Sequence, residues 1–365
     1  MKSYKILNSI NNCIKLNKAC YLNPKLCQYL VQTYESINDI IENITHIKEK
    51  FKINIDKFIS NLNSNIENEL MYIKNNNIQI LTINSKEYPK YLKEIINYPL
   101  ILFTKGNIEC LEKPLFSIVG TRNPSEYASI TTGSFTASLS NYFGIVAGLA
   151  IGIDTVAHQS CINQSNFTIA VLAHGIDSIY PKKNTTLADK IINSKGLLIS
   201  EFPLFSTPEK FHFPQRNRII SGLSQGLLLS EAAIKSGSMI TANFAIEQNR
   251  EIFALPGNIT NKNAEGPIHL IQQGAKCVFN ANDIFEEFNL SNPHIKTESE
   301  EIKQKSNLNF NFTENTILSC LNTSLHIDEI QKKTQLELHT ILHTLTFLEI
   351  KSAIKKISAN TYIKT

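Results

Sequence analysis

Glycine is confined to the middle of this chain, and this distribution constrains the fold more than any other feature of the sequence. All 14 glycines of the 365 residues lie between Gly106 and Gly274. Glycine supplies the positive-φ turns and close backbone approaches that short connections between strands and helices require. The central segment is therefore predicted to combine strands with helices, whereas the flanking segments must fold without such turns.

The central segment alternates short apolar runs with helical patterns. Helical spacing occurs at 127–141, 153–163 and 238–249, among apolar runs that read LFSIVG, GIVAG, TIAVLAH, LLISEF, GLLLSEA, EIFALPG and KCVF. Continuous apolar runs separated by helices are typical of parallel strands buried on both faces. We predict an α/β fold with a Rossmann-like, doubly wound, mainly parallel sheet. Ligands of such sheets bind beyond the carboxyl ends of the strands, so the residues that follow each run are the functional candidates.

The segments around this sheet are predicted to form domains of their own. Residues 1–80 carry apolar residues at helical spacing and predict a small helical domain ahead of the Rossmann-like domain at 81–290. Residues 291–312 are polar and aperiodic, which is typical of a linker. Residues 313–365 offer three short helical patterns and a candidate hairpin, which predicts a winged-helix domain. Its third helical pattern contains no Lys or Arg, so contact with DNA and contact with protein both stay open.

Composition restricts the class of protein. Lys or Asn interrupts every apolar run in the first twenty residues, and no run of about 18 apolar residues occurs, so neither a signal peptide nor a membrane span is predicted. The seven cysteines are scattered without a C-x-x-C, which is typical of reduced thiols in a cytoplasm and argues against zinc. The fingerprints G-x-G-x-x-G and Walker A do not occur. We therefore expect a cytoplasmic protein without metal or cofactor.

The turn after the first run of the central segment is a candidate anion site. In the sequence VGTRNPSEY, Gly120 and Thr121 offer backbone N–H groups at the start of a helix, and Arg122 adds a guanidinium. A helix N-terminus favours phosphate, and a guanidinium can form two parallel hydrogen bonds with it. Arginine is rare here, which suggests that it is kept where lysine cannot replace its planar donors. All four arginines lie in the central segment: Arg122, Arg216, Arg218 and Arg250.

The segment 208–224, which reads PEKFHFPQRNRIISGLS, interleaves cations with aromatic residues. Lys210, Arg216 and Arg218 can follow the phosphates of a nucleic acid, while Phe213 stacks on a base. This combination suits a single strand. Alternatively, the rings belong to the core and the cations to a solvated face. The two prolines of the segment argue against a regular buried helix and favour binding.

A second candidate anion site precedes the helical pattern at 238–249. Lys235, Ser236, Gly237 and Ser238 follow a predicted strand. Unpaired N–H groups at a helix start, together with two hydroxyls and a cation, can hold a phosphate.

Three carboxylates leave a catalytic alternative open. Asp154, Glu201 and Glu231 follow predicted strands and are candidate acids or bases for a Rossmann-like nucleotide or phosphoribosyl hydrolase. Asp154 is better explained as a cap of the following helix. Hydrolases of that type carry a P-G-G-x-G-T loop, whereas the comparable stretch here, 256–260, reads PGNIT. We therefore expect a binding protein, with no catalytic residues.

In sequence order, these motifs resemble the DNA-processing protein A family (DprA, also called Smf). The resemblance covers about residues 105–280, through VGTRNPSEY, GLAIGIDTVAH, TIAVLAHGIDSIYP, LISEFPL, FPQRNRIISGLS and EAAIKSGSMITANFAIEQNREIFALPGN. It implies a cytoplasmic homodimer that binds single-stranded DNA and helps to load the RecA recombinase in natural transformation or recombination. It also implies that the N-terminal helices are sterile-alpha-motif-like. The nucleic-acid-binding residues expected from the motifs are Gly120, Thr121, Arg122, Lys210, Phe213, Arg216, Asn217, Arg218, Lys235, Ser236, Gly237 and Ser238.

Binding through these residues is predicted to be strand-selective and salt-dependent. Each phosphate contacted on a single strand contributes about 0.7 to the fall of log affinity with log salt concentration, so four or five cations predict a slope near −3 to −4. Titrating a labelled single strand and its duplex with the protein at several salt concentrations measures both properties. Equal affinity for the two forms at every salt concentration would refute this interpretation.

Overall fold

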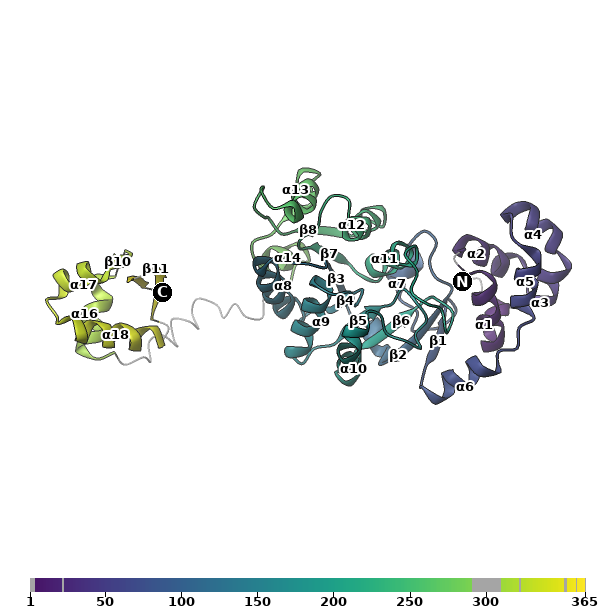
Figure 1. The fold of residues 1–365 in the computed structure, drawn as a ribbon, viewed down its shortest axis with the longest axis horizontal. Helices are drawn as coiled ribbons and strands as arrows, with labels where there is room; N and C mark the ends of the chain where they lie inside the picture. The colour runs from purple at the N-terminus through teal and green to yellow at the C-terminus, as the bar shows by residue number, and fades with distance from the viewer. Residues whose placement is uncertain are drawn as a thin grey trace. The chain divides into compact units, whose positions relative to one another are not determined.

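The protein folds into two compact units, residues 1–291 and 292–365. The computed structural model describes residues 4–21, 23–290, 310–321, 323–350, 353–358 and 360–364, with the elements labelled in Figure 1. Each unit has a hydrophobic core of its own.

A nine-stranded sheet forms the centre of the first unit. In spatial order its strands are β1 (Gln79–Thr82), β2 (Ile101–Gly106), β6 (Leu197–Ser200), β5 (Thr168–Val171), β4 (Gly144–Ala147), β3 (Leu115–Val119), β7 (Gly226–Leu229), β8 (Glu251–Ala254) and β9 (Lys276–Cys277). The strands from β3 to β9 are parallel, whereas β2 is antiparallel to both of its neighbours. The predicted α/β class, with a doubly wound and mainly parallel sheet, is confirmed.

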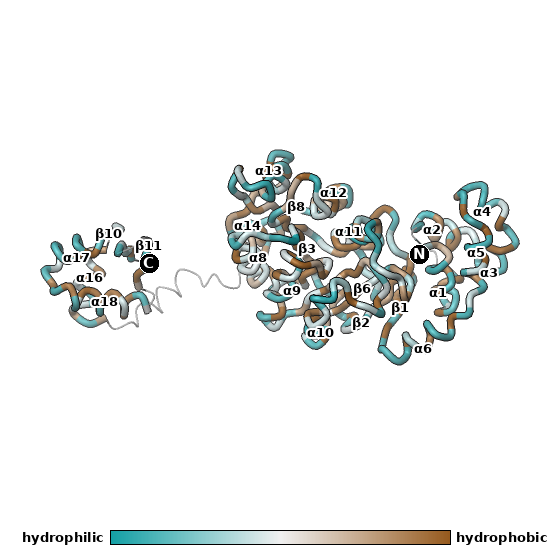
Figure 2. The backbone as a smooth tube through the Cα atoms, in the orientation of Figure 1, coloured by the Kyte–Doolittle hydropathy of each residue, from teal (hydrophilic) through white to brown (hydrophobic). Residues whose placement is uncertain are grey.

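Helices cover both faces of the parallel strands. Along β3, Phe116 and Ile118 pack toward one layer of helices, whereas Leu115 and Val119 pack toward the other. This double burial explains the continuous apolar runs, and Figure 2 shows the hydrophobic residues concentrated on the strands. The first layer contains α8 (Glu126–Leu139), α9 (Ile153–Asn163), α10 (Thr185–Asn193) and α14 (Asn282–Glu287). The second contains α7 (Lys90–Glu94), α11 (His212–Leu223), α12 (Gly237–Glu247) and α13 (Glu265–Gln272).

The helices predicted at 127–141, 153–163 and 238–249 are present as α8, α9 and α12. Helix α10, which connects β5 to β6, was not predicted, because most of its residues are polar and its apolar stripe is short. Short 3-10 turns complete the unit: η1 (Lys5–Asn8), η2 (Ile108–Glu112), η3 (Lys182–Asn184) and η4 (Lys262–Ala264).

Helix α11 contradicts the expectation that segment 208–224 contains no regular buried helix. The segment is helical from His212 to Leu223, and every residue from Arg216 onward is buried. Pro214 is compatible with this helix because it lies in the first turn, where a backbone N–H has no partner within the helix. The argument from proline was wrong because it ignored the position of the residue within the helix.

The N-terminal segment is helical, as predicted, and shares a core with the sheet. Leu16 and Leu30 from the helices belong to the same buried cluster as Phe103 and Leu198 from the strands. The helices and the sheet therefore form one compact unit, and position 80 lies within β1. A sterile-alpha-motif-like fold for these helices stays a prediction. They are α1 (Ile10–Ala19), α2 (Pro24–Thr33), α3 (Ile37–Glu42), α4 (Ile44–Phe51), α5 (Ile55–Leu62) and α6 (Glu67–Asn75).

Within its described residues, the second unit has three helices and a small antiparallel sheet of order β10-β12-β11. Its elements are α16 (Phe312–Cys320), β10 (Leu325–His326), α17 (Ile327–Thr334), α18 (Leu338–Ile350), β11 (Ile354–Ser358) and β12 (Thr361–Lys364). The predicted helical patterns and hairpin are present, and the winged-helix assignment stays a prediction. Most of the predicted linker at 291–312 lies outside the described residues. Among the helices of the described ranges, none is long and apolar enough to cross a membrane.

One buried histidine fixes helix α9 against the sheet. The His158 side chain is fully buried, and its Nδ1 lies 2.8 Å from the Thr168 hydroxyl on β5. Since that hydroxyl donates to the Ile145 carbonyl, Nδ1 carries the imidazole proton. Burial lowers the pKa of His158 to about 3, and the nearby charge of Arg216 adds to the effect. His158 is thus a neutral residue of the core.

Replacing His158 with Asn is expected to reduce the acid sensitivity of the fold. The unfolded chain binds a proton at this residue below its ordinary pKa of 6.5, whereas the native chain does so only near 3, so stability falls as the pH falls between these values. When the pH is lowered from 6.5 to 4.5, the unfolding free energy of the wild type should fall by about 2 kcal/mol more than that of His158→Asn. Urea denaturation at each pH measures this difference. His46→Asn, at an exposed position, is the control, and parallel curves for wild type and His158→Asn would contradict the prediction.

Candidate functional site

A cleft of about 310 Å³ lies at the carboxyl edge of the sheet, where the strand order reverses. Strand β3 stands at this reversal, with β4 on one side and β7 on the other. Ligands of doubly wound sheets bind at this position, because the connections on the two sides of the reversal diverge. Turns after β3, β4 and β7 line the cleft together with α11. The lining residues are Val119, Gly120, Thr121, Arg122, Ala150, Asp154, Phe213, Arg216, Asn217, Ile220, Ser236, Gly237, Ser238 and Thr241.

The cleft brings together most of the residues predicted to bind nucleic acid. Gly120, Thr121, Arg122, Phe213, Arg216, Asn217, Ser236, Gly237 and Ser238 all line it. The exceptions are Lys210, Lys235 and Arg218. Lys210 and Lys235 are exposed and lie two residues before the starts of α11 and α12, whereas Arg218 is buried elsewhere.

Arg216 forms a buried wall of the cleft instead of an exposed phosphate ligand. Its Nη1 donates to the carbonyl oxygens of Gly148, at 2.8 Å, and Val171, while Nε donates to the Asn217 side chain at 3.1 Å. Burial lowers the pKa of Arg216 to about 10, with Asp154 opposing the shift. These hydrogen bonds attach α11 to the ends of β4 and β5. The charge of Arg216 reaches the cleft, but most of its donors are used within the protein.

The glycine at position 148 is required by this arrangement. A Cβ atom there would lie 2.5 Å from the guanidinium of Arg216, which packs directly on the backbone of Gly148. The backbone of the motif GLAIGID therefore lies directly against an internal side chain.

Arg218 was predicted to bind nucleic acid, but it does not line the cleft. It is 5% exposed and pairs with the carboxylate of Glu201, which is also buried. Burial raises the pKa of Glu201, and Arg218 opposes that shift. The stretch RNR points its two arginines in different directions because α11 rotates successive residues by about 100° around its axis. A buried pair of this kind fixes α11 to the end of β6.

Asp154 does not cap helix α9 as expected. Its carboxylate accepts hydrogen bonds from the backbone N–H groups of Gly148, at 2.9 Å, and Ala150, at 3.2 Å. Burial raises the pKa of Asp154, and Arg216 opposes that shift. The residue thus holds the turn that precedes its own helix, next to the guanidinium of Arg216.

The other two carboxylates of the hydrolase alternative also have internal partners. Glu201 pairs with Arg218, as described above. Glu231 accepts hydrogen bonds from the N–H and hydroxyl of Ser125 and from the side chain of Asn261. Each carboxylate therefore has a role in holding a loop.

The accessible cation of the cleft is Arg122. It is exposed and takes part in none of the ion pairs found within the described ranges. Its guanidinium lies 5.5 Å from the ring centroid of Phe213, a distance at which a cation is attracted to the ring. The ring of Phe213 is half-buried and also lies 6.0 Å from that of Tyr180. A free guanidinium and an aromatic ring therefore stand side by side in the cleft.

The start of α12 forms the opposite part of the lining. Ser236 caps the helix by accepting a hydrogen bond from the N–H of Met239, and Ser238 donates to the Gly120 carbonyl at 2.7 Å. The hydroxyl of Ser238 therefore joins the two predicted anion sites to each other. The first N–H groups of α12 have no partner within the helix and face a site where the helix dipole favours an anion.

Sequence reasoning missed four lining residues: Val119, Ala150, Ile220 and Thr241. Thr241 lies four residues after Gly237 on α12, and Ile220 lies four residues after Arg216 on α11. Residues at that spacing share a helix face, so the pattern could have identified both.

Comparisons with known proteins agree on one family. Residues 79–289 match the family described as DNA recombination-mediator protein A. DNA processing protein DprA of Bacillus subtilis is 47% identical over 212 residues, 58% of this chain and 71% of that protein. Protein Smf of Escherichia coli is 41% identical over 231 residues, 63% of this chain and 62% of that protein.

Solved structures extend the match to the fold. The crystal structure of DprA from Streptococcus pneumoniae has a TM-score of 0.67 at 34% identity, covering 76% of this chain and 98% of that one. A structure of DprA from Helicobacter pylori, described for its single-stranded DNA binding mode, has a TM-score of 0.52 at 30% identity, covering 57% and 95%. Because the family match spans more than half of the sequence and includes every turn that lines the cleft, this chain belongs to the DNA recombination-mediator protein A family.

Proposed function

We propose that this protein binds single-stranded DNA in the cleft at the carboxyl edge of its sheet and acts as a recombination mediator. The observation that carries the proposal is the pairing of an exposed guanidinium, Arg122, with the ring of Phe213 beside the start of α12. A strand whose bases are unpaired offers both of the groups that this arrangement recognises, a phosphate and an open base face.

The chemistry favours a single strand over a duplex. In a duplex the base faces are stacked inside the helix, so only the phosphates would be available to the cleft. A single strand can place a phosphate at Arg122 and the N–H groups of α12 while an adjacent base stacks at Phe213. The solved relative from Helicobacter pylori, which is described for its binding of single-stranded DNA, supports the same ligand here.

The family also suggests the partners of this activity. We propose that the protein is a cytoplasmic homodimer that delivers single-stranded DNA to the RecA recombinase, in natural transformation or in recombination. Analytical sedimentation would test whether the protein is a dimer by measuring its molar mass in solution. The rate at which RecA assembles on a strand coated with single-strand-binding protein, with and without this protein, would measure delivery.

Titration of labelled oligothymidylate, compared with a duplex of equal length, tests the binding proposal directly. The sequence alone predicted a slope of log affinity against log salt concentration of −3 to −4. The structure lowers the expected magnitude, because Arg216 and Arg218 are buried and bonded within the protein. Arg122, Lys210 and Lys235 are exposed, and at about 0.7 per contacted phosphate they give a slope near −2 per subunit. Tighter binding of the duplex would overturn the proposal.

Arg122→Ala is expected to weaken binding of oligothymidylate by about 10- to 100-fold, because a hydrogen-bonded charge contributes about 1.5–3 kcal/mol. Arg122→Lys should recover only part of this loss, since an ammonium cannot form the two parallel bonds of a guanidinium. Fluorescence anisotropy gives the affinities.

The control for this pair is Lys190→Ala, which removes one exposed charge from the last turn of α10, at the opposite edge of the sheet. Arg250 is unsuitable as a control, because it is buried and donates to the carbonyl oxygens of Tyr91 and Gly222. Equal losses from Arg122→Ala and Lys190→Ala would place the DNA elsewhere.

Phe213→Ala is expected to lower the affinity for single strands by about 1–3 kcal/mol while leaving the salt slope nearly unchanged, because stacking involves no counterions. The ring is half-buried and lies at the cleft, so Tm should change little. Phe205→Ala removes a ring that is 50% exposed and is not part of the cleft lining, and serves as the control. If Phe213→Ala instead costs the roughly 3–5 kcal/mol of stability expected of a core residue, and the folded fraction binds normally, the stacking role is wrong.

A further inference from the structure

Helix α11 lines the cleft but does not fix its own first turn. Its N-cap residue, Phe211, makes no capping hydrogen bond through its side chain, and Pro214 removes one backbone donor from that turn. The second half of the helix is anchored by apolar residues such as Ile219 and Leu223, which belong to the core beneath the sheet. The first half carries Phe213, which must therefore be oriented by contacts with other parts of the chain.

The N-terminal helices supply one of these contacts through a single side chain. The hydroxyl of Tyr21, which follows α1, lies 2.5 Å from Nε2 of His212, the first residue of α11, and the two rings meet edge to face. On the other side of the ring, Nδ1 accepts a hydrogen bond from the backbone N–H of Glu209 at 3.2 Å and lies 3.1 Å from the Ala173 carbonyl oxygen. His212 is thus held from two sides, by the N-terminal helices and by the loop after β5.

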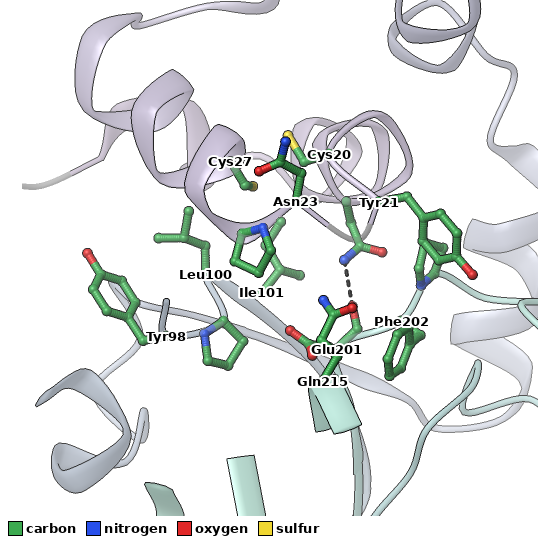
Figure 3. A pocket seen from close by; sticks show the side chains of 14 residues that line it. Cys20, Tyr21, Asn23, Cys27, Tyr98, Leu100, Ile101, Glu201, Phe202 and Gln215 are labelled. Atoms are coloured by element: carbon green, nitrogen blue, oxygen red, sulfur yellow. Dashed lines mark hydrogen bonds between the residues drawn. The ribbon is translucent and has the colours of Figure 1, made fainter. Parts of the chain in front are cut away.

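A second link runs through the end of β6. The side chain of Asn17, on α1, donates to the backbone carbonyl of Glu201 at 2.8 Å, and the carboxylate of Glu201 pairs with Arg218 on α11. Figure 3 shows the region around this hydrogen bond, with Tyr21 and Phe202 at one side and Gln215 of α11 beside Glu201. The first link ends on the first residue of α11, and the second ends on Arg218 in the second half of the helix.

Packing between the two parts is incomplete at this point. A pocket of about 40 Å³ separates α1 and α2 from the end of β6 and from Gln215, so apolar contact alone does not set the distance (Figure 3). Beside this pocket, the polar link of Tyr21 reaches the first residue of α11, and that of Asn17 reaches Arg218 farther along the helix.

We propose that Tyr21 is a positioning residue for single-stranded DNA binding, which it supports by holding the first turn of α11, and with it Phe213, in place at the cleft; Asn17 supports the same helix farther along, through Glu201 and Arg218. This inference rests on the proposed function. It assigns to the N-terminal helices an effect on affinity that requires no contact between them and the DNA.

Tyr21→Phe tests the proposal with the full chain, because it removes the hydroxyl and keeps the ring. Affinity for oligothymidylate should fall about 2- to 10-fold, the value of one hydrogen bond, with an unchanged salt slope because no cation is lost. Asn17→Ala should act in the same direction. The control is Tyr29→Phe, since the ring of Tyr29 packs on Tyr34 and Phe51 within the N-terminal helices. Wild-type affinity in both test variants would overturn the proposal.

A double-variant cycle separates positioning from general stability. If Tyr21 acts through Phe213, then Tyr21→Phe should change affinity less than 2-fold when Phe213 is already Ala. Losses that simply multiply would show that Tyr21 does not act through the first turn of α11.

Hydrogen exchange gives a readout that needs no DNA. In Tyr21→Phe the amides of residues 212, 213 and 215–217 should exchange faster, whereas those of 219–223 should not change. Identical exchange in wild type and variant defeats the inference, even if the protein binds DNA as proposed. Conversely, faster exchange in a protein that shows no preference for single strands would defeat the proposed function and leave the positioning of α11 intact.

Discussion

The buried guanidinium of Arg216 is the interaction on which the cleft depends. A guanidinium taken out of water must find acceptors for its N–H groups, because leaving them unpaired costs several kcal/mol. Here the acceptors are the carbonyls of Gly148 and Val171 and the side chain of Asn217, with Asp154 nearby as the balancing charge. The carbonyls of Gly148 and Val171 lie at the ends of β4 and β5, so hydrogen bonding of one side chain fixes the position of α11 at the edge of the sheet.

The arginines in and near the cleft have different roles. Arg216 and Arg218 are each bonded within the protein and hold α11 to the ends of β4, β5 and β6, whereas Arg122 is exposed. The buried charge of Arg216 adds to the positive potential of the cleft, since a low-dielectric wall screens it poorly. The exposed guanidinium can then meet a ligand without breaking any internal bond, and the neighbouring ring of Phe213 limits the directions in which it can point.

Two glycines allow the turns of the cleft to approach this closely. Gly148 leaves room for the guanidinium of Arg216, and Gly152, with φ of 85°, brings its turn against the backbone of Thr121, 2.4 Å from where a Cβ would lie. The cleft is therefore built mainly from backbone and fixed side chains. The first turn of α11 has no side-chain cap at its N-terminus, and it is where the N-terminal helices make contact.

The sequence alone determined the architecture and the location of the cleft, because continuous apolar runs identify buried parallel strands and the residues after them must gather at one edge. It also named Gly120, Arg122, Phe213 and the start of α12 as candidate nucleic-acid-binding residues, and the structure shows that they line one cleft. What it did not determine was which cations reach solvent. Arg216 is buried by carbonyls 68 and 45 positions away and Arg218 by a carboxylate 17 positions away, and such pairings exist only once the strands and α11 are assembled. Local spacing records the type of each side chain and its face of a helix, whereas burial of a charge depends on which distant partners the tertiary structure brings to it.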